Sequence, residues 1–377
     1  MPDTETTDAP PFVPTDVALC IDPEVYRRLR PMLRHLCVGM IDWNASVRLI
    51  TPSDEVGSLM IGPIQMITYD QPLWPMSHLR SARQRRLQVL VDKLVDRPPT
   101  VVHAISSGSF EAAELLAERF DVDLVLQLTA FRDVDALTSV LVEHTDCFIA
   151  SSQPLLDRLE DAVSVSADQV HLIRPGTLAG PGPTCFSKPG AIPTVLCAES
   201  FRPGCGVHHL LRAARTLLDR KREFLAFLTG AGPMESELRK QAHALGLSAA
   251  VIFAHPTGSA ERIMVGADIF VQPSMDTALT VGPIHALANG MAVIAVGGGA
   301  GDYFVDGVTA LVLRDASPEA LADAIERMLD APDFAIQLAN GGLNHIRNYH
   351  PISAMAEQTV TGYQTLAARR RTYSLNR

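Results

Sequence analysis

The stretch from residue 267 to residue 312 reads ADIFVQPSMDTALTVGPIHALANGMAVIAVGGGAGDYFVDGVTALV. Two apolar runs typical of buried strands, Ile269–Gln272 and Ala292–Val296, flank a helical pattern over residues 282–289. Gly290 ends that helix, and three glycines follow the second strand. This order predicts a βαβ unit with a ligand pocket at its strand ends, because glycine lets a backbone approach a ligand closely.

The rest of the chain repeats this alternation of strands and helices on both sides of one break. Residues 174–193 hold five prolines and four glycines, a composition typical of a linker between domains. We therefore expect an α/β protein with two Rossmann-like domains facing across a cleft, residues 15–173 and residues 194–350. Residues 1–14 are acidic and rich in Thr and Pro, which predicts a disordered tail.

Composition narrows the classes of function. A hydrophobic share of 47% fits a soluble α/β protein, and a net charge of −10 argues against nucleic-acid binding. The sequence has neither an apolar run long enough to span a bilayer nor a charged and apolar leader, so we expect a cytoplasmic protein. The six cysteines form no C-x-x-C pair and have no histidines at zinc-binding spacing, so we expect reduced thiols and no metal site.

The opening stretch resembles the donor-binding half of GT-B glycosyltransferases of family 4. That family carries A-D-x-x-x-x-P-S, two glutamates separated by seven residues, G-x-P-V, G-G-x-x-E and D-G-x-T-G. This chain keeps Ala267-Asp268, Pro273-Ser274, Gly290, Val293, Gly298-Gly299 and Asp306-Gly307-Val308-Thr309. A second match, Gly230-Ala231-Gly232-Pro233, is similar to the family's G-x-G-P.

The resemblance implies a GT-B architecture and a nucleotide diphosphate-sugar as the donor substrate. It implies sugar transfer with retention, no metal and no other cofactor. It also implies that the last segment, residues 351–377, forms a helix that packs back on the first domain.

The charged groups of the family pattern are replaced. The Arg and Lys that stabilise the leaving diphosphate correspond to Ser200 and Cys205, so only Arg202 between them carries a positive charge. The two glutamates correspond to Thr277 and His285. No catalytic residue can be assigned. The resemblance implies donor-binding roles for Arg202, Gly230, Gly232, Thr277, His285, Gly298, Gly299 and Asp302, and places His103 and Thr129 in the cleft.

Three functions are open at this point. The first is a glycosyltransferase with an altered set of donor contacts. The second is a catalytically silent relative that binds a nucleotide, a glycan or a protein partner. The third is a dinucleotide-dependent oxidoreductase with Gly230 and Gly232 in its phosphate loop, which we rank last because the third glycine of that motif would be Glu235. Binding of one nucleotide-sugar in a calorimetric panel would favour the first over the second.

An arginine-rich helical pattern over residues 77–96 has two interpretations. Its cations could rest on anionic lipid at the inner membrane face, as a basic helix of the first domain does in many relatives. We favour a solvated helix face, since the acidic residues Asp92 and Asp96 lie nearby. The residues concerned are Arg80, Arg83, Arg85 and Arg86.

Overall fold

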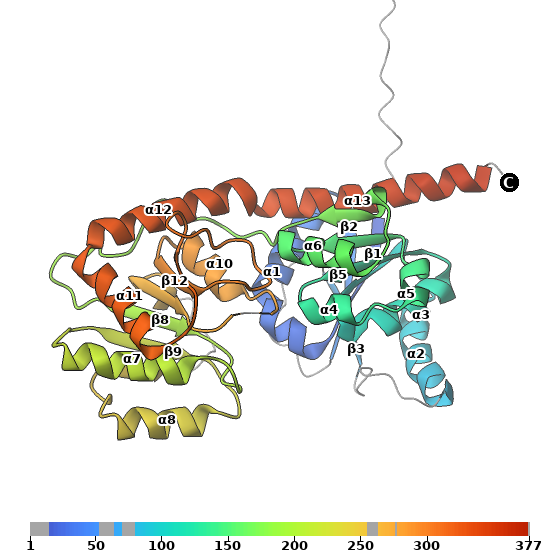
Figure 1. Cartoon of the computed structure of the whole chain (residues 1–377). Coiled ribbons are helices and arrows are strands. Elements are labelled where there is room, and N and C mark those ends of the chain that lie inside the picture. The colour runs from blue at the N-terminus through green and yellow to red at the C-terminus, as the bar shows by residue number, and fades with distance from the viewer. Residues whose placement is uncertain (1–14, 53–63, 70–79, 255–262, 276, 376–377) are drawn as a thin grey trace, which may run out of the picture.

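The computed structural model describes residues 15–52, 64–69, 80–254, 263–275 and 277–375, which form two α/β domains side by side (Figure 1). The tail predicted for residues 1–14 lies outside the described residues. In each domain a parallel sheet is covered by helices on both faces, so the expected fold class is confirmed.

The first domain is built on a seven-stranded sheet with the order β3-β2-β1-β4-β5-β6-β7. Its central strand, β4, is buried along its whole length, because helices cover it on both sides. The strands are β1 Thr15–Ile21, β2 Ala45–Pro52, β3 Gln65–Tyr69, β4 Val101–Ile105, β5 Asp123–Leu128, β6 Cys147–Ala150 and β7 Val170–Leu172. The helices are α1 Pro23–Asp42, α2 Arg80–Leu94, α3 Phe110–Phe120, α4 Phe131–Asp135, α5 Ser139–His144 and α6 Gln153–Ala162.

The second domain has a six-stranded sheet with the order β10-β9-β8-β11-β12-β13. Its strands are β8 Thr194–Ala198, β9 Leu225–Thr229, β10 Val251–Ala254, β11 Ile269–Gln272, β12 Ala292–Val296 and β13 Leu311–Leu313. The helices are α7 Val207–Asp219, α8 Glu235–Ala244, α10 Val281–Ala288, α11 Pro318–Asp330 and α12 Pro332–Tyr349. In both sheets the strand order reverses beside the first strand of the domain, which is the usual place for a ligand in such sheets.

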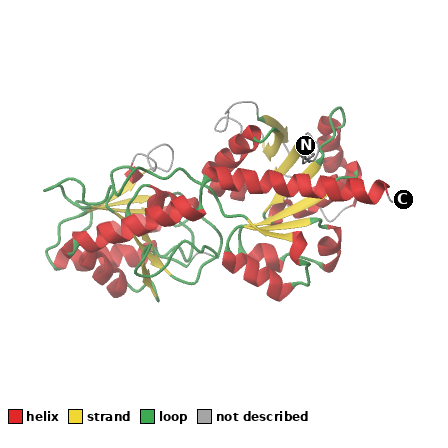
Figure 2. Cartoon of the chain, turned by 90° about the horizontal axis from the view of Figure 1, so that it is seen from above, coloured by secondary structure: helices red, strands yellow, loops and turns green. Residues whose placement is uncertain are grey.

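The last helix, α13 Ile352–Leu375, crosses from the second domain and lies along the first (Figures 1 and 2). It packs against α1 so closely that a side chain on Gly39 would meet the Ala356 side chain at 2.7 Å. At the far end, Arg369 pairs with Asp168 at 3.1 Å. The chain therefore joins the two domains twice, through the linker and through this helix.

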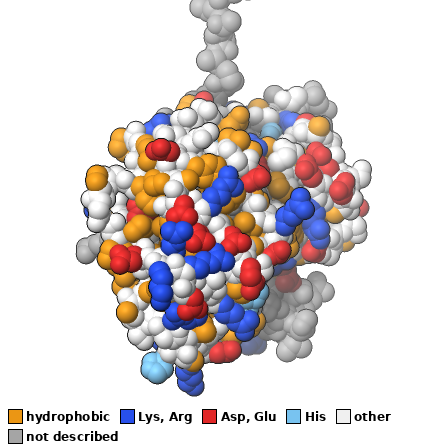
Figure 3. Space-filling model, turned by 60° about the vertical axis from the view of Figure 1, so that its left-hand side comes forward, with side chains coloured by type: hydrophobic (Ala, Val, Ile, Leu, Met, Phe, Trp, Pro, Cys, Tyr) orange, Lys and Arg blue, Asp and Glu red, His pale blue; other side chains and the backbone are white. Residues whose placement is uncertain are grey.

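The outer face of the second domain carries charges of both signs intermixed (Figure 3). In this domain, two arginines just after α7 pair with acidic residues on α11 at 2.6–2.7 Å. The residues are Arg220 and Arg222, with Asp323, Glu326 and Asp330. Among the described residues, no helix is both long and apolar enough to cross a membrane.

Candidate functional site

The carboxyl ends of the strands in the two sheets meet at the interface between the domains. The segment after β5 contacts the segment after β11, and the segment after β6 contacts the segment after β12. The start of α1, directly after β1, faces the loop after β8. Ligands of α/β proteins bind at such strand ends, so this interface is the candidate functional site.

The contact between β5 and β11 is made by the backbone. The amide of Phe131 donates to the carbonyl of Thr277 at 2.9 Å, and the amide of Leu279 donates to the carbonyl of Thr129 at 2.7 Å. Ala130 and Ala278 thereby form a short antiparallel bridge. Thr129 is fully buried at this junction, whereas the side chain of Thr277 is exposed. The bridge closes this part of the interface.

The contact between β6 and β12 centres on Asp302. Its Oδ2 accepts from Arg174 Nε at 2.8 Å and from Arg174 Nη2 at 2.7 Å. The same oxygen accepts from the amide of Gln153, the first residue of α6, at 3.1 Å. Ser152 also donates its hydroxyl to the carbonyl of Ala300. Asp302 thus joins the second domain to the linker and to the first domain.

The contact between β1 and β8 is made by charged side chains, which we call the charged corner: Glu24, Arg28, Arg132 and Arg202. Arg132 of the first domain lies 3.8 Å from Glu24 Oε1, and Arg202 of the second domain lies 3.9 Å from the same oxygen. All three of these side chains are about half exposed, at 49–56%. Guanidinium groups from both domains therefore flank a single carboxylate.

Arg28 lies one helical turn beyond Glu24 on α1 and is more deeply buried. Its Nη2 donates to Thr129 Oγ1 at 3.1 Å, and that hydroxyl donates to the buried carboxylate of Asp133 at 3.2 Å. Within the described part of the chain, Arg28 Nε has no hydrogen-bond partner. Burial lowers the pKa of Arg28, while the charge of Asp133 acts against that shift and the charge of Arg132 adds to it.

Asp133 organises the strand ends of the first domain. Its carboxylate accepts from the hydroxyl of Ser106 at 2.6 Å and from the amide of Ser107 at 2.9 Å. It also accepts from the amides of Thr129 and Ala130 at 2.8 and 2.9 Å. A buried carboxylate with this many donors is well compensated, so it fixes the loops after β4 and β5.

The glycines predicted to bind the donor are explained in part by packing. A side chain on Gly230 would meet the carbonyl oxygen of Glu199 at 1.8 Å, and one on Gly232 would meet that of Phe201 at 2.3 Å. These two glycines let the loop after β9 lie on the loop after β8. Gly298, at the end of β12, has φ +86°, and it is exposed while Gly299 is half-buried.

Glu199 places a second buried carboxylate at the site, directly after β8. It is 8% exposed, and Gln272 Nε2 donates to its Oε1. The hydroxyl of Ser274 lies 3.5 Å from the same oxygen. A buried carboxyl group therefore lies in the segment where the resemblance implies a site for a diphosphate.

His285 lies on α10 and faces α1 of the first domain. Burial lowers its pKa to about 4, and the nearby His35 of α1 contributes to the shift. His285 is therefore neutral at physiological pH, in a state in which a ring nitrogen can accept a hydrogen bond.

The cleft position predicted for His103 is wrong. His103 lies in the middle of β4 with no exposed surface, and its Nδ1 is 2.6 Å from the hydroxyl of Tyr363 on α13. Burial lowers the pKa of His103 to about 3. The residue belongs to the packing between the sheet and the last helix, because alternate side chains of a strand point to opposite faces.

Sequence reasoning missed five residues of the interface: Glu24, Arg28, Arg132, Asp133 and Glu199. One signal was present, since Glu24 and Arg28 are four residues apart and so share a face of the predicted helix. Nothing local indicated that this face meets the loop after β8.

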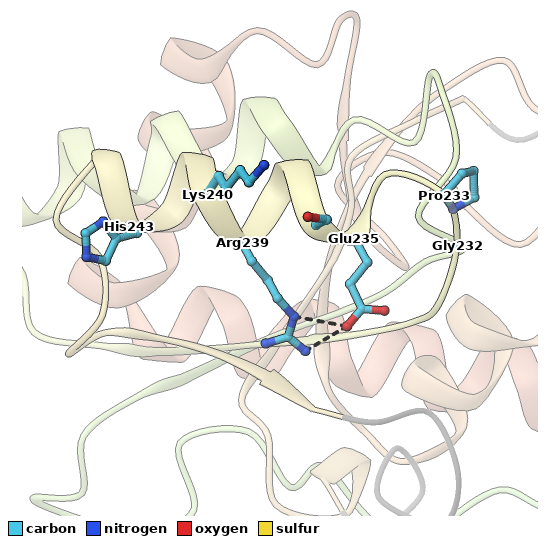
Figure 4. A pocket seen from close by; sticks show the side chains of 7 residues that line it. Gly232, Pro233, Glu235, Arg239, Lys240 and His243 are labelled. Carbon is cyan, nitrogen blue, oxygen red and sulfur yellow. Dashed lines mark hydrogen bonds and ion pairs between the residues drawn. The ribbon is translucent and has the colours of Figure 1, made fainter.

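Two other features lie away from the interface. An open pocket runs along α8, lined by Gly232, Pro233, Glu235, Ser236, Arg239, Lys240 and His243 (Figure 4). Within it Arg239 already pairs with Glu235 at 2.8 Å.

Of the arginine-rich helix, Arg85 is exposed on α2, whereas the side chains of Arg80, Arg83 and Arg86 lie outside the described residues. No cluster of three potential metal ligands occurs among the described residues.

Residues 187–345 match the family described as glycosyl transferases group 1. This match covers most of the second domain. The chain is 26% identical over 229 residues to the D-inositol 3-phosphate glycosyltransferase of Corynebacterium glutamicum, a match that covers 55% of each chain. It thus spans about half the length of that relative. It is 26% identical to the lipopolysaccharide core biosynthesis mannosyltransferase LpcC of Rhizobium leguminosarum, over 72% of this chain and 81% of that one.

Solved structures of GT-B glycosyltransferases share the fold over nearly the whole chain. Sucrose-phosphate synthase from Thermosynechococcus elongatus superposes with a TM-score of 0.78 at 19% identity, over 94% of this chain and 100% of that one. Anabaena Alr3699/HepE in complex with UDP-glucose superposes with a TM-score of 0.73 at 15% identity, over 94% and 99%. At these identities the likeness shows a shared fold.

Proposed function

We propose that the protein binds a nucleotide diphosphate-sugar at the interface between its domains and transfers the sugar with retention, without a metal. The observation that carries this proposal is the meeting of the strand ends of both sheets at one interface. Gly298 and Gly299 of the donor-site pattern follow β12, in the segment whose Ala300 and Asp302 contact the first domain. HepE of Anabaena, which shares this fold, was crystallised with UDP-glucose, and this supports a sugar nucleotide as the donor class.

A site for this reaction must stabilise the diphosphate leaving group. A departing diphosphate gains negative charge, so cationic or N–H donors must lie where that charge develops. Ser200 and Cys205 supply no charge, and burial raises the pKa of the Cys205 thiol, which keeps it neutral. Arg202 is the cation that the second domain supplies near these positions. On this proposal it binds the diphosphate together with arginines of the first domain.

A catalytically silent relative is the second candidate, and Glu199 favours it. A buried carboxylate directly after β8 repels a diphosphate that approaches the same strand end. Asp302, the residue at the position of the family's third glutamate, is already bound to Arg174. On this reading the interface holds a nucleotide, a glycan or a protein partner without turning it over.

A binding panel followed by a turnover assay tests the proposal. Calorimetry with UDP-, GDP- and ADP-sugars is expected to give a micromolar Kd for one of them. NMR of that sugar nucleotide with protein and candidate acceptors is then expected to show product with the anomeric configuration of the donor. Binding without turnover would select the silent relative, and an inverted product would contradict the retaining mechanism. No binding in the panel would contradict the nucleotide-sugar proposal.

A further inference from the structure

The three contacts between the strand ends differ in how tightly they are held. The bridge of Thr129 and Leu279 and the clamp on Asp302 use hydrogen bonds of 2.7–3.1 Å. At the charged corner, both arginines lie 3.8–3.9 Å from Glu24 Oε1. These distances exceed the 2.6–2.7 Å of the pairs that Arg220 and Arg222, just after α7, make with α11. The charged corner is thus the loosely bonded part of this interface.

The arginines of the charged corner are better suited to a phosphate group than to the carboxylate between them. Guanidinium groups form charge-assisted bonds to phosphate oxygens at about 2.7–2.9 Å. A single carboxylate oxygen at nearly 4 Å satisfies neither Arg132 nor Arg202 in this way. A tetrahedral phosphate has oxygens that point in several directions, so it can bond one arginine from each domain at the same time.

Further groups at the corner favour an anion there. Glu24 lies in the first turn of the 20-residue helix α1, whose N-terminal end favours negative charge. Arg28 lies behind, with a buried Nε that has no partner among the described residues. The carboxylates of Asp22 and Asp133 lie near Arg28, so they partly compensate its charge. The side chain of Glu24 is 56% exposed, which leaves it room to move away.

We propose that the charged corner is a phosphate-binding site. In the absence of ligand the Glu24 carboxylate occupies the anion position, and the phosphate group of a ligand displaces it. Arg132 and Arg202 then bind the phosphate from opposite domains, and Arg28 adds charge from behind. This inference rests on the proposed function for one of its two possible ligands, the diphosphate of a sugar nucleotide. The other is the phosphate of a phosphorylated acceptor.

The experiment measures binding by calorimetry with four probes: UDP, glucose 6-phosphate, inorganic phosphate and uridine. The variants are Glu24→Gln, Arg132→Gln and Arg202→Gln. The matched control is Arg215→Gln, which removes an arginine paired with Asp219 on the outer face of α7. UDP represents the donor, glucose 6-phosphate represents a phosphorylated acceptor, and uridine lacks phosphate.

The site predicts changes in opposite directions. Glu24→Gln is expected to tighten binding of the phosphate-containing ligand about tenfold, because no carboxylate then competes for the arginines. Arg132→Gln and Arg202→Gln are each expected to weaken it about tenfold. Arg215→Gln should bind as the wild type does, and no variant should change uridine binding. A misfolded variant cannot mimic the gain expected for Glu24→Gln.

The outcomes separate this inference from the proposed function. UDP binding that is unchanged in all three variants would overturn the phosphate site and leave the nucleotide-sugar proposal standing. Glucose 6-phosphate or inorganic phosphate that binds and responds to the variants, without UDP binding, would support the site and contradict the nucleotide-sugar proposal. If no probe binds to the wild type, both are wrong.

Discussion

Single residues in the loops of the second domain decide how closely its strand ends can approach one another. Gly230 follows β9, and its Cα lies against the backbone of the loop after β8. The amide of Glu199 donates to the carbonyl of Thr229 at 3.0 Å, and that of Phe201 donates to the carbonyl of Ala231 at 3.0 Å. The absence of a side chain at Gly230 allows these two loops to form one surface.

Gly230→Ala is expected to lower the free energy of unfolding by about 3 kcal/mol, because the new methyl group would lie 1.8 Å from the carbonyl oxygen of Glu199. Urea denaturation measures the change. Gly266→Ala is the matched control, since a methyl group there meets no heavy atom within 4 Å. If the two variants were equally stable, the loops after β8 and β9 could move apart without loss of stability, which would contradict this prediction.

Among the elements, α13 follows the second domain in sequence but packs on the first domain. Its Tyr363 contacts His103 of β4, and the two rings meet edge to face with centroids 5.9 Å apart. Burial keeps His103 neutral, with a pKa of about 3, below its ordinary 6.5. The contact between the sheet and the last helix is therefore sensitive to acid.

Acid is expected to destabilise the protein through this contact. Between pH 6.5 and about 3, the unfolded chain binds a proton at His103 and the folded chain does not. The contribution of His103 to the free energy of unfolding is fully present above pH 6.5. Below pH 6.5 this contribution decreases by roughly 1.4 kcal/mol per pH unit. Urea denaturation at pH 7, 6 and 5 should show a shallower fall for His103→Gln than for the wild type. His243→Gln, on the exposed end of α8, is the control, and identical slopes for all three proteins would contradict the assignment.

For the whole molecule, several contacts join the domains besides the linker and α13, and they include an apolar cluster shared by Leu155 and Ile284 and the polar contacts at the strand ends. Asp302 is the most connected of them, since its carboxylate joins the loop after β12 to Arg174 of the linker and to the start of α6. The side chains of Asp302 and Arg174 are only 14% and 25% exposed. An ion pair so shielded from water is more sensitive to loss of one partner than a pair on the surface.

Asp302→Ala is expected to lower the free energy of unfolding by roughly 2 kcal/mol, because it leaves Arg174 half-buried and unpaired. It is also expected to speed hydrogen exchange at the amide of Gln153, which loses its acceptor. Asp135→Ala serves as the control. Its pair with Arg158 is about half exposed, so its loss should change stability by less than about 1 kcal/mol. If the two variants behave alike, Asp302 does not hold the domains together.

The two strands and the helix expected within residues 267–312 followed from local patterns to within one residue. The strands Ile269–Gln272 and Ala292–Val296 occur as expected, because apolar runs and glycine stops depend on neighbours in the chain. The two α/β domains followed from the same alternation. The glycines of the donor-site pattern, Gly290, Gly298 and Gly299, could also be recognised from their spacing, and their role in donor binding stays a prediction.

The chemistry at the site could not be predicted in the same way. In the sequence, Arg202 was the only cation between Ser200 and Cys205. The fold places it near Glu24, 178 positions away in the numbering, and brings Arg132 to the same carboxylate oxygen. Asp302 was expected to bind a ligand, and in the structure its carboxylate is paired with Arg174. His103 was expected at the interface, and the fold buries it under α13.

By itself the sequence determined two α/β domains, a linker and a glycine frame typical of sugar-nucleotide sites, because each depends on residues within one or two turns of chain. Only the tertiary structure decided which charges meet, because electrostatic partners are set by distance in space. The approach of β1 to β8, of β5 to β11 and of β6 to β12 depends on how the two sheets dock.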